Sequence, residues 1–337
     1  MPTLSRNTFA LTVAASVTTA ISLTTIGAAQ AGDSVDRSDW PSSITVATAS
    51  QGGTYYVYGS GWANLIADEL GISGGGEITG GPTQNMALVH SGDVALGLTT
   101  MGPAAQALNG ESPLAPGMKM DNVCALFPMY ETPFSVAALS SSGIDSIDSI
   151  PDGARIGFGP AASTSDTYFP AILSELGVEY ERRNGGWSDL GSQLQDGLID
   201  VVAFAAGIPI PAVSQLEVQT GVNFIEFTEA QQEKIVEDFP VAPFTIPAST
   251  YSTLDHDLRA VSMWNFTIAN CDLPADFVYQ VVKLSMENND RMRDIHRSAA
   301  SSVPENLKYN TVLPYHPGAV RWYEENGYDI DPSLIRQ

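Results

Sequence analysis

Short apolar strands alternate with amphipathic helices along this chain. Residues 44–49 (ITVATA) predict a buried strand, and a loop of small residues follows at 50–54. A helix is predicted next, because apolar side chains recur there at helical spacing: Trp62, Leu65, Ile66 and Leu70. Gly71 predicts the end of this helix, since glycine readily adopts the left-handed conformation that closes helices.

The second half of the chain repeats this pattern. Residues 155–158 predict a short strand, residues 159–165 (GPAASTS) a small-residue loop, and an apolar stripe ending at Gly177 a helix. Segments 90–98 and 195–204 both leave a helix and enter a buried strand. Strands that alternate with helices indicate open, largely parallel sheets, so we expect an α/β protein with two lobes of similar architecture.

Ligands of such sheets bind beyond the carboxyl ends of the strands. Both small-residue loops are therefore expected to face one shared cleft, with residues 123–134 and 258–270 crossing between the lobes. Each loop opens a helix, whose first N–H groups lack partners and carry a partial positive charge. The expected anion-binding residues are Gly53, Thr54, Tyr55, Ser163, Thr164 and Ser165. Taken singly, each loop is better explained by helix capping, but two such loops at matching positions after buried strands favour binding.

Other residues in expected cleft positions extend this candidate site. The turn at 79–85 carries two amides, which either bind a polar ligand or cap the next helix. Further candidates follow buried strands, and two others are aromatic residues. Aromatic side chains more often belong to the core than to a ligand site. These candidates are Gln84, Asn85, Thr99, Thr100, Tyr130, Trp187, Gly207 and Pro209.

The composition narrows the possible partners. The chain has 337 residues, with 15 Lys and Arg against 38 Asp and Glu, for a net charge of −23. Such a charge repels phosphate backbones, so no nucleic-acid partner is expected. The two cysteines, Cys124 and Cys271, are too few for a disulfide scaffold, and they either form one disulfide or are buried separately.

The N-terminus predicts export. Residues 8–28 form an apolar stretch rich in Thr, Ser and Ala, and Ala29-Gln30-Ala31 has the small-x-small pattern of a cleavage site. We expect a signal peptide at residues 1–31, cleaved after Ala31, and a periplasmic product. A retained membrane anchor is the less favoured interpretation of this stretch.

Catalytic patterns are missing from the sequence. The four histidines are scattered, Asp255-His256-Asp257 lies in a polar turn without further metal ligands, and no G-x-S-x-G, P-loop or G-x-G-x-x-G motif occurs. We therefore expect no enzyme activity, no catalytic residues, no cofactor and no metal. An exported hydrolase using Ser163 or Ser165 would need a positioned histidine and acid near them.

Several segments together resemble one known family. GGTYY at 52–56, TGGPTQN at 79–85, GPAASTSDTY at 159–168 and YHPGA at 315–319 stand in the order of the TAXI solute-binding proteins, the extracytoplasmic receptors of TRAP transporters. The resemblance covers about residues 44–330. It implies a two-lobed fold like that of type II periplasmic binding proteins, with lobe I at 32–128, lobe II at 129–261 and a return to lobe I at 262–337.

The resemblance also implies a function. Such receptors close on a small acidic solute, glutamate or a related dicarboxylate such as 2-oxoglutarate, and deliver it to a sodium-coupled TRAP permease; a monomer is expected. This chain departs from the family pattern at Pro82, at Thr164 and at Thr99-Thr100, all in expected cleft loops. The remaining alternatives are a receptor for a neutral or aromatic solute and a ligand sensor that feeds a signalling partner.

Overall fold

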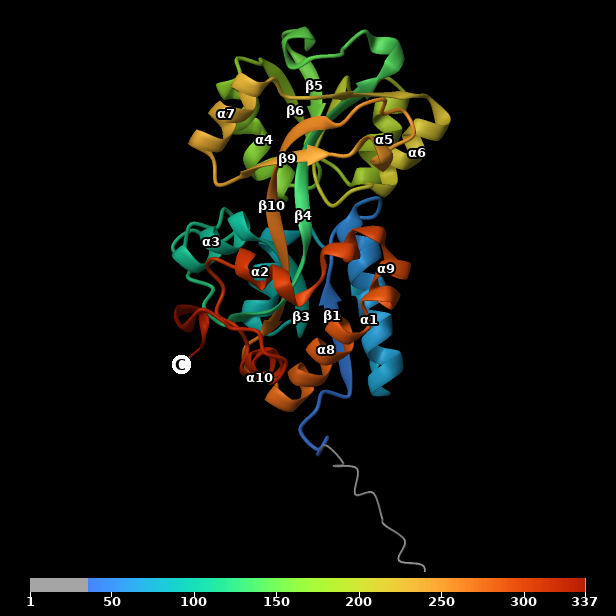
Figure 1. Cartoon of the computed structure of the whole chain (residues 1–337). Helices are drawn as coiled ribbons and strands as arrows, with labels where there is room; N and C mark the ends of the chain where they lie inside the picture. The colour runs from blue at the N-terminus through green and yellow to red at the C-terminus, as the bar shows by residue number, and fades with distance from the viewer. Residues whose placement is uncertain (1–35, 337) are drawn as a thin grey trace, which may run out of the picture. The chain divides into compact units, whose positions relative to one another are not determined.

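The computed structural model describes residues 36–336, so the expected signal peptide lies outside the described residues. From Arg37 onward the chain forms one compact unit, which contains two groups of α/β elements joined by two long antiparallel strands, β4 (Val123–Leu139) and β10 (Leu258–Asn270). Figure 1 shows these strands running side by side from one group to the other. Both segments that we expected to cross between lobes therefore do so.

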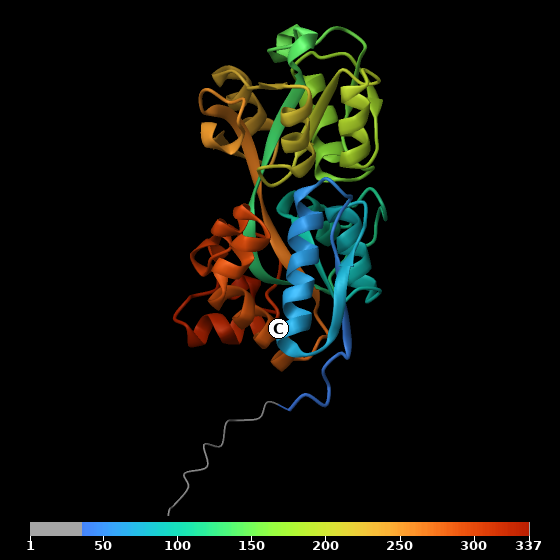
Figure 2. The same cartoon turned by 90° about the vertical axis from the view of Figure 1, so that its right-hand side faces the viewer.

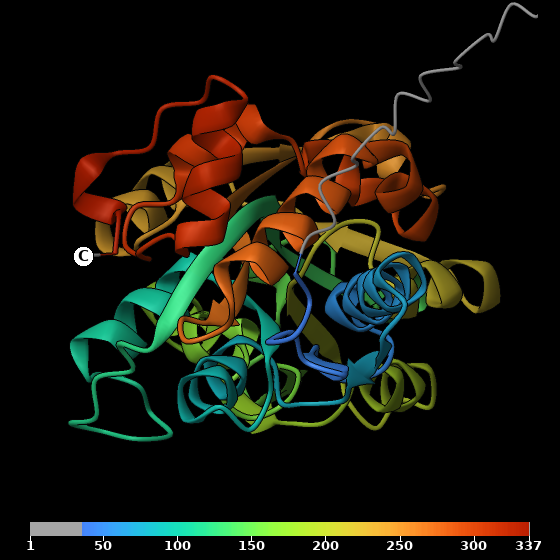
Figure 3. The same cartoon turned by 90° about the horizontal axis from the view of Figure 1, so that it is seen from below.

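Lobe I contains the first strands and helices and the C-terminal helices. Its strand order is β2-β1-β3-β10-β4. The elements are β1 (Ser43–Ala47), α1 (Thr54–Leu70), β2 (Ser73–Glu77), α2 (Pro82–Ser91), β3 (Leu96–Thr100), α3 (Met101–Asn109), α8 (Ala275–Glu287), α9 (Asn289–Ile295) and α10 (Pro317–Glu325). Seen from below, α8 and α10 lie on one side of the strands, and α2 and α3 lie on the other (Figure 3).

Lobe II contains the middle of the chain. Its strand order runs β4-β7-β5-β6, with β8 added beside β4 and β9 beside β10. The elements are β5 (Ala154–Gly157), α4 (Thr164–Glu175), β6 (Tyr180–Arg183), α5 (Trp187–Gln195), β7 (Val201–Ala205), α6 (Pro211–Gln219), β8 (Val222–Ile225), α7 (Glu229–Asp238) and β9 (Ala242–Ile246).

Both lobes are built on the same parallel unit, as the repeated sequence pattern predicted. In lobe I, β1 pairs in parallel with β2 and β3, and in lobe II, β5 pairs in parallel with β6 and β7. The helix α1 ends where expected, because Gly71 adopts a left-handed conformation with φ of 67°. The repeated unit places equivalent loops of the two lobes at the carboxyl ends of their strands.

Separate hydrophobic cores support the two lobes. Tyr130 belongs to the core of lobe I and Phe134 to a core of lobe II, whereas on the return strand Met263 packs in lobe II and Phe266 in lobe I. We therefore propose that the chain crosses between lobes at residues 131–133 and 264–265. In Figure 2, α1 (blue) stands beside the crossing strands, with its first turn directly below lobe II.

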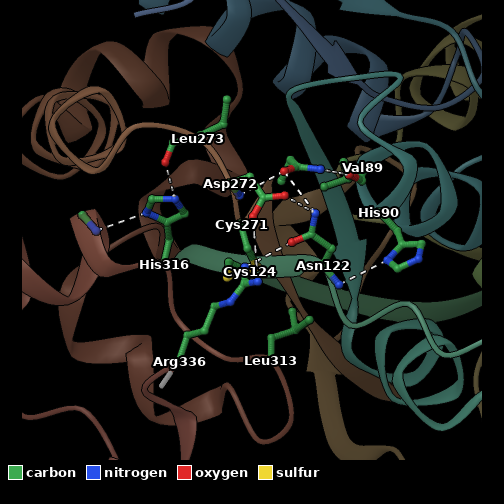
Figure 4. Close-up of a disulfide and its surroundings, with 12 residues drawn as sticks. Val89, His90, Asn122, Cys124, Cys271, Asp272, Leu273, Leu313, His316 and Arg336 are labelled. Carbon is green, nitrogen blue, oxygen red and sulfur yellow. Dashed lines mark hydrogen bonds and ion pairs between the residues drawn. A yellow bond between two sulfur atoms is a disulfide. The ribbon is translucent and has the colours of Figure 1, made fainter. Parts of the chain in front are cut away.

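A disulfide joins the crossing strands at their lobe I ends. Cys124 lies near the start of β4, and Cys271 follows the last residue of β10. Around it, Arg336 donates a hydrogen bond to Asn122 Oδ1 at 3.1 Å, and His316 Nε2 lies 3.1 Å from the carbonyl oxygen of Leu273 (Figure 4). Of the two interpretations that the sequence left open, the structure shows the disulfide.

Across residues 36–336, no helix combines the length and the apolar character that a membrane span requires.

Candidate ligand-binding site

A narrow cavity lies between the two lobes. Its volume is about 400 Å³, which includes space open to solvent. The lining contains both hydroxyl-bearing and apolar residues, and it suits a small solute. It consists of Ala49, Gly53, Thr54, Tyr55, Gly80, Gly81, Pro82, Thr100, Thr132, Pro160, Ser163, Thr164, Ser165, Trp187, Ala205 and Ala206.

Five helices begin at this cavity. Its lining includes the first residues of α1, α2, α4 and α5, together with Thr100, the residue immediately before α3. First-turn N–H groups have no acceptor inside their own helix, and each helix start carries roughly half a positive charge. The cavity is therefore surrounded by partial positive charge although no Lys, Arg or His lines it.

No lining side chain neutralises this positive charge. The lining contains no Asp or Glu, and α1, α2 and α3 have no acidic residue in their first turns, whereas α5 carries the exposed Asp189 in its first turn. In α4, Asp166 is buried in the first turn, but its carboxylate accepts hydrogen bonds from Ala162 N at 2.8 Å and Asn184 Nδ2 at 2.6 Å and pairs with Arg182. A small anion held by neutral donors matches this electrostatic environment.

Asn265, on the crossing strand β10, connects three hydroxyls of the cavity lining through its side-chain amide. Its Oδ1 lies 2.7 Å from the Tyr55 hydroxyl and 2.9 Å from the hydroxyls of both Thr100 and Thr132. Its Nδ2 donates to the carbonyl oxygen of Tyr130 at 2.7 Å, where the pairing of β10 with β4 is interrupted by a register shift. The Asn265 amide thus donates to the Tyr130 carbonyl, which the interrupted pairing of β10 with β4 leaves without a backbone partner.

Tyr55 acts in this network as a neutral donor. Its side chain is buried, and burial raises the pKa of its phenol far above the ordinary value, while the hydrogen bond with Thr100 opposes the shift only partly. The phenol therefore keeps its proton at any physiological pH.

Direct hydrogen bonds join the lobes around the cavity. Thr54 donates to the carbonyl oxygen of Gly207, and Thr164 donates to the Thr100 hydroxyl at 3.1 Å. Two backbone bonds add to them, from Ser188 N to Gln51 O and from Ala212 N to Gly52 O. These contacts hold the lobes against each other with the cavity enclosed between them.

Gly207 is required for this close approach. A Cβ atom at this position would come within 2.2 Å of Tyr130 Cε2. The aromatic ring that we expected in the cleft instead packs behind it against Gly207. Tyr130 is buried, and neither residue lines the cavity.

Eight of the fourteen residues expected to bind the ligand line the cavity: Gly53, Thr54, Tyr55, Thr100, Ser163, Thr164, Ser165 and Trp187. The other six are placed outside the lining. Gln84 is exposed and accepts a hydrogen bond from Gly80 N, Thr99 points to the other face of β3, and Pro209 O lies 3.2 Å from His296 Nε2. Tyr130 and Gly207 lie behind the cavity, as described.

Asn85, the sixth, is occupied with structural hydrogen bonds. Its Nδ2 donates to the carbonyl oxygens of Thr48 at 2.7 Å and Leu98 at 2.8 Å, and its Oδ1 accepts from Thr79 at 2.6 Å. Both amide protons are therefore used to fix the ends of neighbouring strands. We expect Asn85 to contribute to the stability of lobe I and not to touch the solute.

Sequence reasoning missed two polar residues on the crossing strands: Thr132, which lines the cavity, and Asn265, which is hydrogen-bonded to three lining hydroxyls. Thr132 and Asn265 lie in segments recognised only as buried strands, where single polar residues between apolar neighbours were the available signal. Pro82 and Pro160, which add apolar lining, were treated as turn residues. Within the described part of the chain, no group of three or more His, Cys, Asp or Glu side chains is arranged to hold a metal ion.

The chain shares its two-lobed α/β fold with solved periplasmic binding proteins. A periplasmic binding protein named BugD shares it at 14% identity and a TM-score of 0.54, covering 85% of this chain and 98% of its own. MatC from Rhodopseudomonas palustris, solved with bound malate, shares it at 16% identity and a TM-score of 0.54, covering 84% and 96%. The sequence matches the NMT1-like family over residues 46–327, so the chain belongs to that family.

Proposed function

We propose that this protein is an extracytoplasmic solute receptor that binds a small carboxylate between its lobes and delivers it to a membrane transporter. The observation that carries the proposal is the cavity at five helix starts, with no charged side chain in its lining. A carboxylate accepts hydrogen bonds from such N–H groups and is stabilised by their partial charges. No lining residues combine a nucleophile with a base, so a receptor role is favoured over catalysis.

The membrane partner we propose is a TRAP permease. Support comes from the TAXI-like segments of the sequence and from membership of the NMT1-like family. The lobe-to-lobe hydrogen bonds would form only in the closed, solute-bound state, which gives the permease a conformation to recognise. A signalling partner would exploit the same closed state.

Export to an oxidising compartment is part of the proposal. The Cys124–Cys271 disulfide is typical of exported proteins, because the bacterial periplasm favours disulfides and the cytosol does not. Cleavage after Ala31 is tested by N-terminal sequencing of the protein recovered from the periplasm.

An aromatic or neutral solute is the second candidate, favoured by the Trp187 indole in the lining. Stacking between two rings would need a partner ring across the cavity. The Tyr55 phenol is committed to Asn265, and Tyr130 lies behind the cavity. One ring alone is a weaker argument than the five helix starts, so we favour the carboxylate.

Calorimetric titration of protein refolded without carried-over solute tests the proposal. We expect one small acid from a panel of mono- and dicarboxylates to bind and its amide or methyl ester not to bind. Thr164→Val, which removes a bond between the lobes, is expected to weaken binding about 10-fold. Equal binding of acid and amide would exclude the anion site, and no binding by any acid would overturn the carboxylate assignment.

A further inference from the structure

A backbone segment of lobe I contacts the starts of two helices of lobe II. This segment, residues 50–53, precedes α1, and we call it the 50–53 loop. Its Gln51 carbonyl oxygen accepts a hydrogen bond from Ser188 N at 3.3 Å, and its Gly52 carbonyl oxygen accepts one from Ala212 N at 3.0 Å. Ser188 lies in the first turn of α5, and Ala212 lies in the first turn of α6.

These two helices have no side-chain cap of their own. The residues before α5 and α6 are Gly186 and Ile210, and neither makes a side-chain capping bond. In the same lobe, α4 and α7 are capped by the hydroxyls of Ser163 and Thr228. First-turn N–H groups find no acceptor within their own helix, and a missing cap costs stability. The carbonyl oxygens of the 50–53 loop thus cap α5 and α6 from the other lobe.

Gly52 allows the loop to come this close. Its φ is 83°, a left-handed conformation that glycine adopts without steric cost. A Cβ atom at this position would lie 2.7 Å from Ser188 Oγ and 2.8 Å from Ser188 N. Gly53 has a similar constraint, since its Cβ would lie 2.9 Å from Trp187 Cδ1. A side chain at Gly52 would therefore push α5 away from the loop.

The equivalent loop of lobe II is hydrogen-bonded within its own lobe. The carbonyl oxygen of Gly159 accepts from Gly185 N at 3.1 Å and from Asn184 Nδ2 at 3.0 Å. Separation of the lobes would break the bonds that Gln51 and Gly52 make with α5 and α6 and would leave the bonds of Gly159 intact. The closed state therefore differs from an open one in the capping of two helices.

We propose that the 50–53 loop is a latch, and that its capping of α5 and α6 sets how readily the lobes close. Neither Gln51 nor Gly52 lines the cavity, so part of the free energy of closure comes from residues that do not touch a solute. Any contact that stabilises the closed state raises the apparent affinity for a solute that binds this state. Gln51 and Gly52 are thus positioning residues. The latch rests on the proposed receptor function only for the solute that drives closure.

Disulfide trapping tests the latch in solute-free protein. In a Thr100→Cys, Thr164→Cys background of the mature protein, the two new thiols replace hydroxyls that lie 3.1 Å apart across the lobes, so they join when the lobes are closed. We expect Gly52→Ala to slow trapping by oxidised glutathione at least about 10-fold, because closure would bring the new methyl group against α5.

Gly71→Ala is the matched control for this experiment. Gly71 also has a left-handed conformation, with φ of 67°, but a Cβ atom there meets no atom within 4 Å. Both variants carry the backbone strain of alanine at positive φ, and urea unfolding should show similar losses of stability. Gly71→Ala should be trapped within about twofold of the background rate. Equal trapping rates for the two variants would overturn the latch.

Titration separates failure of the latch from failure of the proposed function. The acids are pyruvate, succinate, malate, 2-oxoglutarate and glutamate. For the acid that the wild type binds best, Gly52→Ala should weaken binding at least about 10-fold and Gly71→Ala less than about twofold. Equal affinities of the wild type and Gly52→Ala would overturn the latch and leave the receptor proposal standing. If the wild type binds none of these acids, the carboxylate proposal fails and the trapping rates decide on the latch.

A cap supplied within lobe II should change stability and closure in opposite directions. Gly186→Ser places a hydroxyl just before α5, where an added Cβ meets no atom closer than 3.5 Å. Its Oγ can accept from Ser188 N in place of the Gln51 carbonyl. We expect a higher urea midpoint, because α5 is then capped in the open state too, and about 3-fold slower trapping. An unchanged or lower midpoint, or unchanged trapping, would contradict capping across the lobes.

Discussion

The two lobes contain the same strand–loop–helix arrangement, but the helices that begin at the cavity differ in their capping and first-turn charge. In lobe I, α1 begins after Gly53 without a side-chain cap and without an acid in its first turn. In lobe II, α4 is capped by Ser163, whose Oγ accepts from Asp166 N at 3.3 Å, and Asp166 is buried in its first turn. The same architecture thus provides one open helix start and one that is already compensated.

This difference assigns unequal roles to the lobes. The start of α1 keeps its N–H groups and its partial charge for a solute, whereas Asp166 offsets part of the charge of α4. We therefore expect lobe I to supply most of the attraction for an anion. Lobe II would supply mainly hydroxyls and the contacts that close the cavity, such as Thr164 to Thr100.

Removing the Asn265 side chain from the crossing strand should have the largest effect. Asn265→Ala leaves the hydroxyls of Tyr55, Thr100 and Thr132 without their shared acceptor and the Tyr130 carbonyl without its donor. We expect a loss of about 3 kcal/mol in the free energy of unfolding and at least about 100-fold in affinity. Urea unfolding and calorimetry measure both, with exposed Asn64→Ala as control. Wild-type affinity in the variant would exclude Asn265 from the site.

Removing the disulfide tests whether lobe I can be weakened without touching the cavity. The double variant Cys124→Ser, Cys271→Ser is expected to lose about 3 kcal/mol of unfolding free energy, because the cross-link constrains a long loop of the unfolded chain. Solute affinity should remain within about twofold, since neither cysteine lines the cavity. A large loss of affinity would mean that the lobe I ends of the crossing strands control closure.

Acid should destabilise lobe I through His316. Burial lowers the pKa of this imidazole from 6.5 to about 4. Its Nδ1 accepts from Gly318 N at 3.1 Å, so protonation removes the cap of α10. The unfolded chain binds the proton more readily, so stability is fully present above pH 6.5 and is lost as the pH falls toward 4.

The expected loss is about 2 kcal/mol by pH 5, measured as urea unfolding at a series of pH values. His316→Asn keeps an acceptor at the start of α10 and should flatten this part of the pH profile. If the variant and the wild type lose stability in parallel between pH 6.5 and 5, His316 is not the responsible group.

The smallest effect is expected from making the lobes more alike. Asp166→Asn removes the acid from the start of α4 and weakens its contacts with Arg182 and Ala162. Lobe II should lose about 1 kcal/mol of stability, and affinity for an anion should rise about twofold. A reduced affinity would indicate that Asp166 positions the loop at 162–165 and that its charge matters less.

The repeated unit was predictable because its signals are local. Apolar strand, small-residue loop and amphipathic helix recur in both halves, and strand alternation separates Thr100, which faces the cavity, from Thr99, which does not. The crossing segments were also recognised. Their polar residues were not, because the partners of Asn265 are 133 to 210 positions away in sequence.

Asn85 shows the opposite limitation. A Gly-Gly-Pro turn followed by an amide is compatible with a ligand contact and equally with a structural one, and the sequence does not show where the amide protons go. In the structure, Asn85 donates both amide protons to backbone carbonyls of lobe I. Local spacing identifies a residue capable of binding, but only the fold determines whether its bonds are already used.

The disulfide also has a consequence for the order in which the chain folds. The two cysteines are 147 positions apart, and the segment between them contains every element of lobe II. A chain that is synthesised from its N-terminus completes lobe II before Cys271 is made. Lobe II, which is inserted between the two sequence segments of lobe I, can therefore fold before lobe I is complete. Lobe I is then completed by β10 and the C-terminal helices. Oxidation of Cys124 and Cys271 to the disulfide closes the loop of chain that contains lobe II.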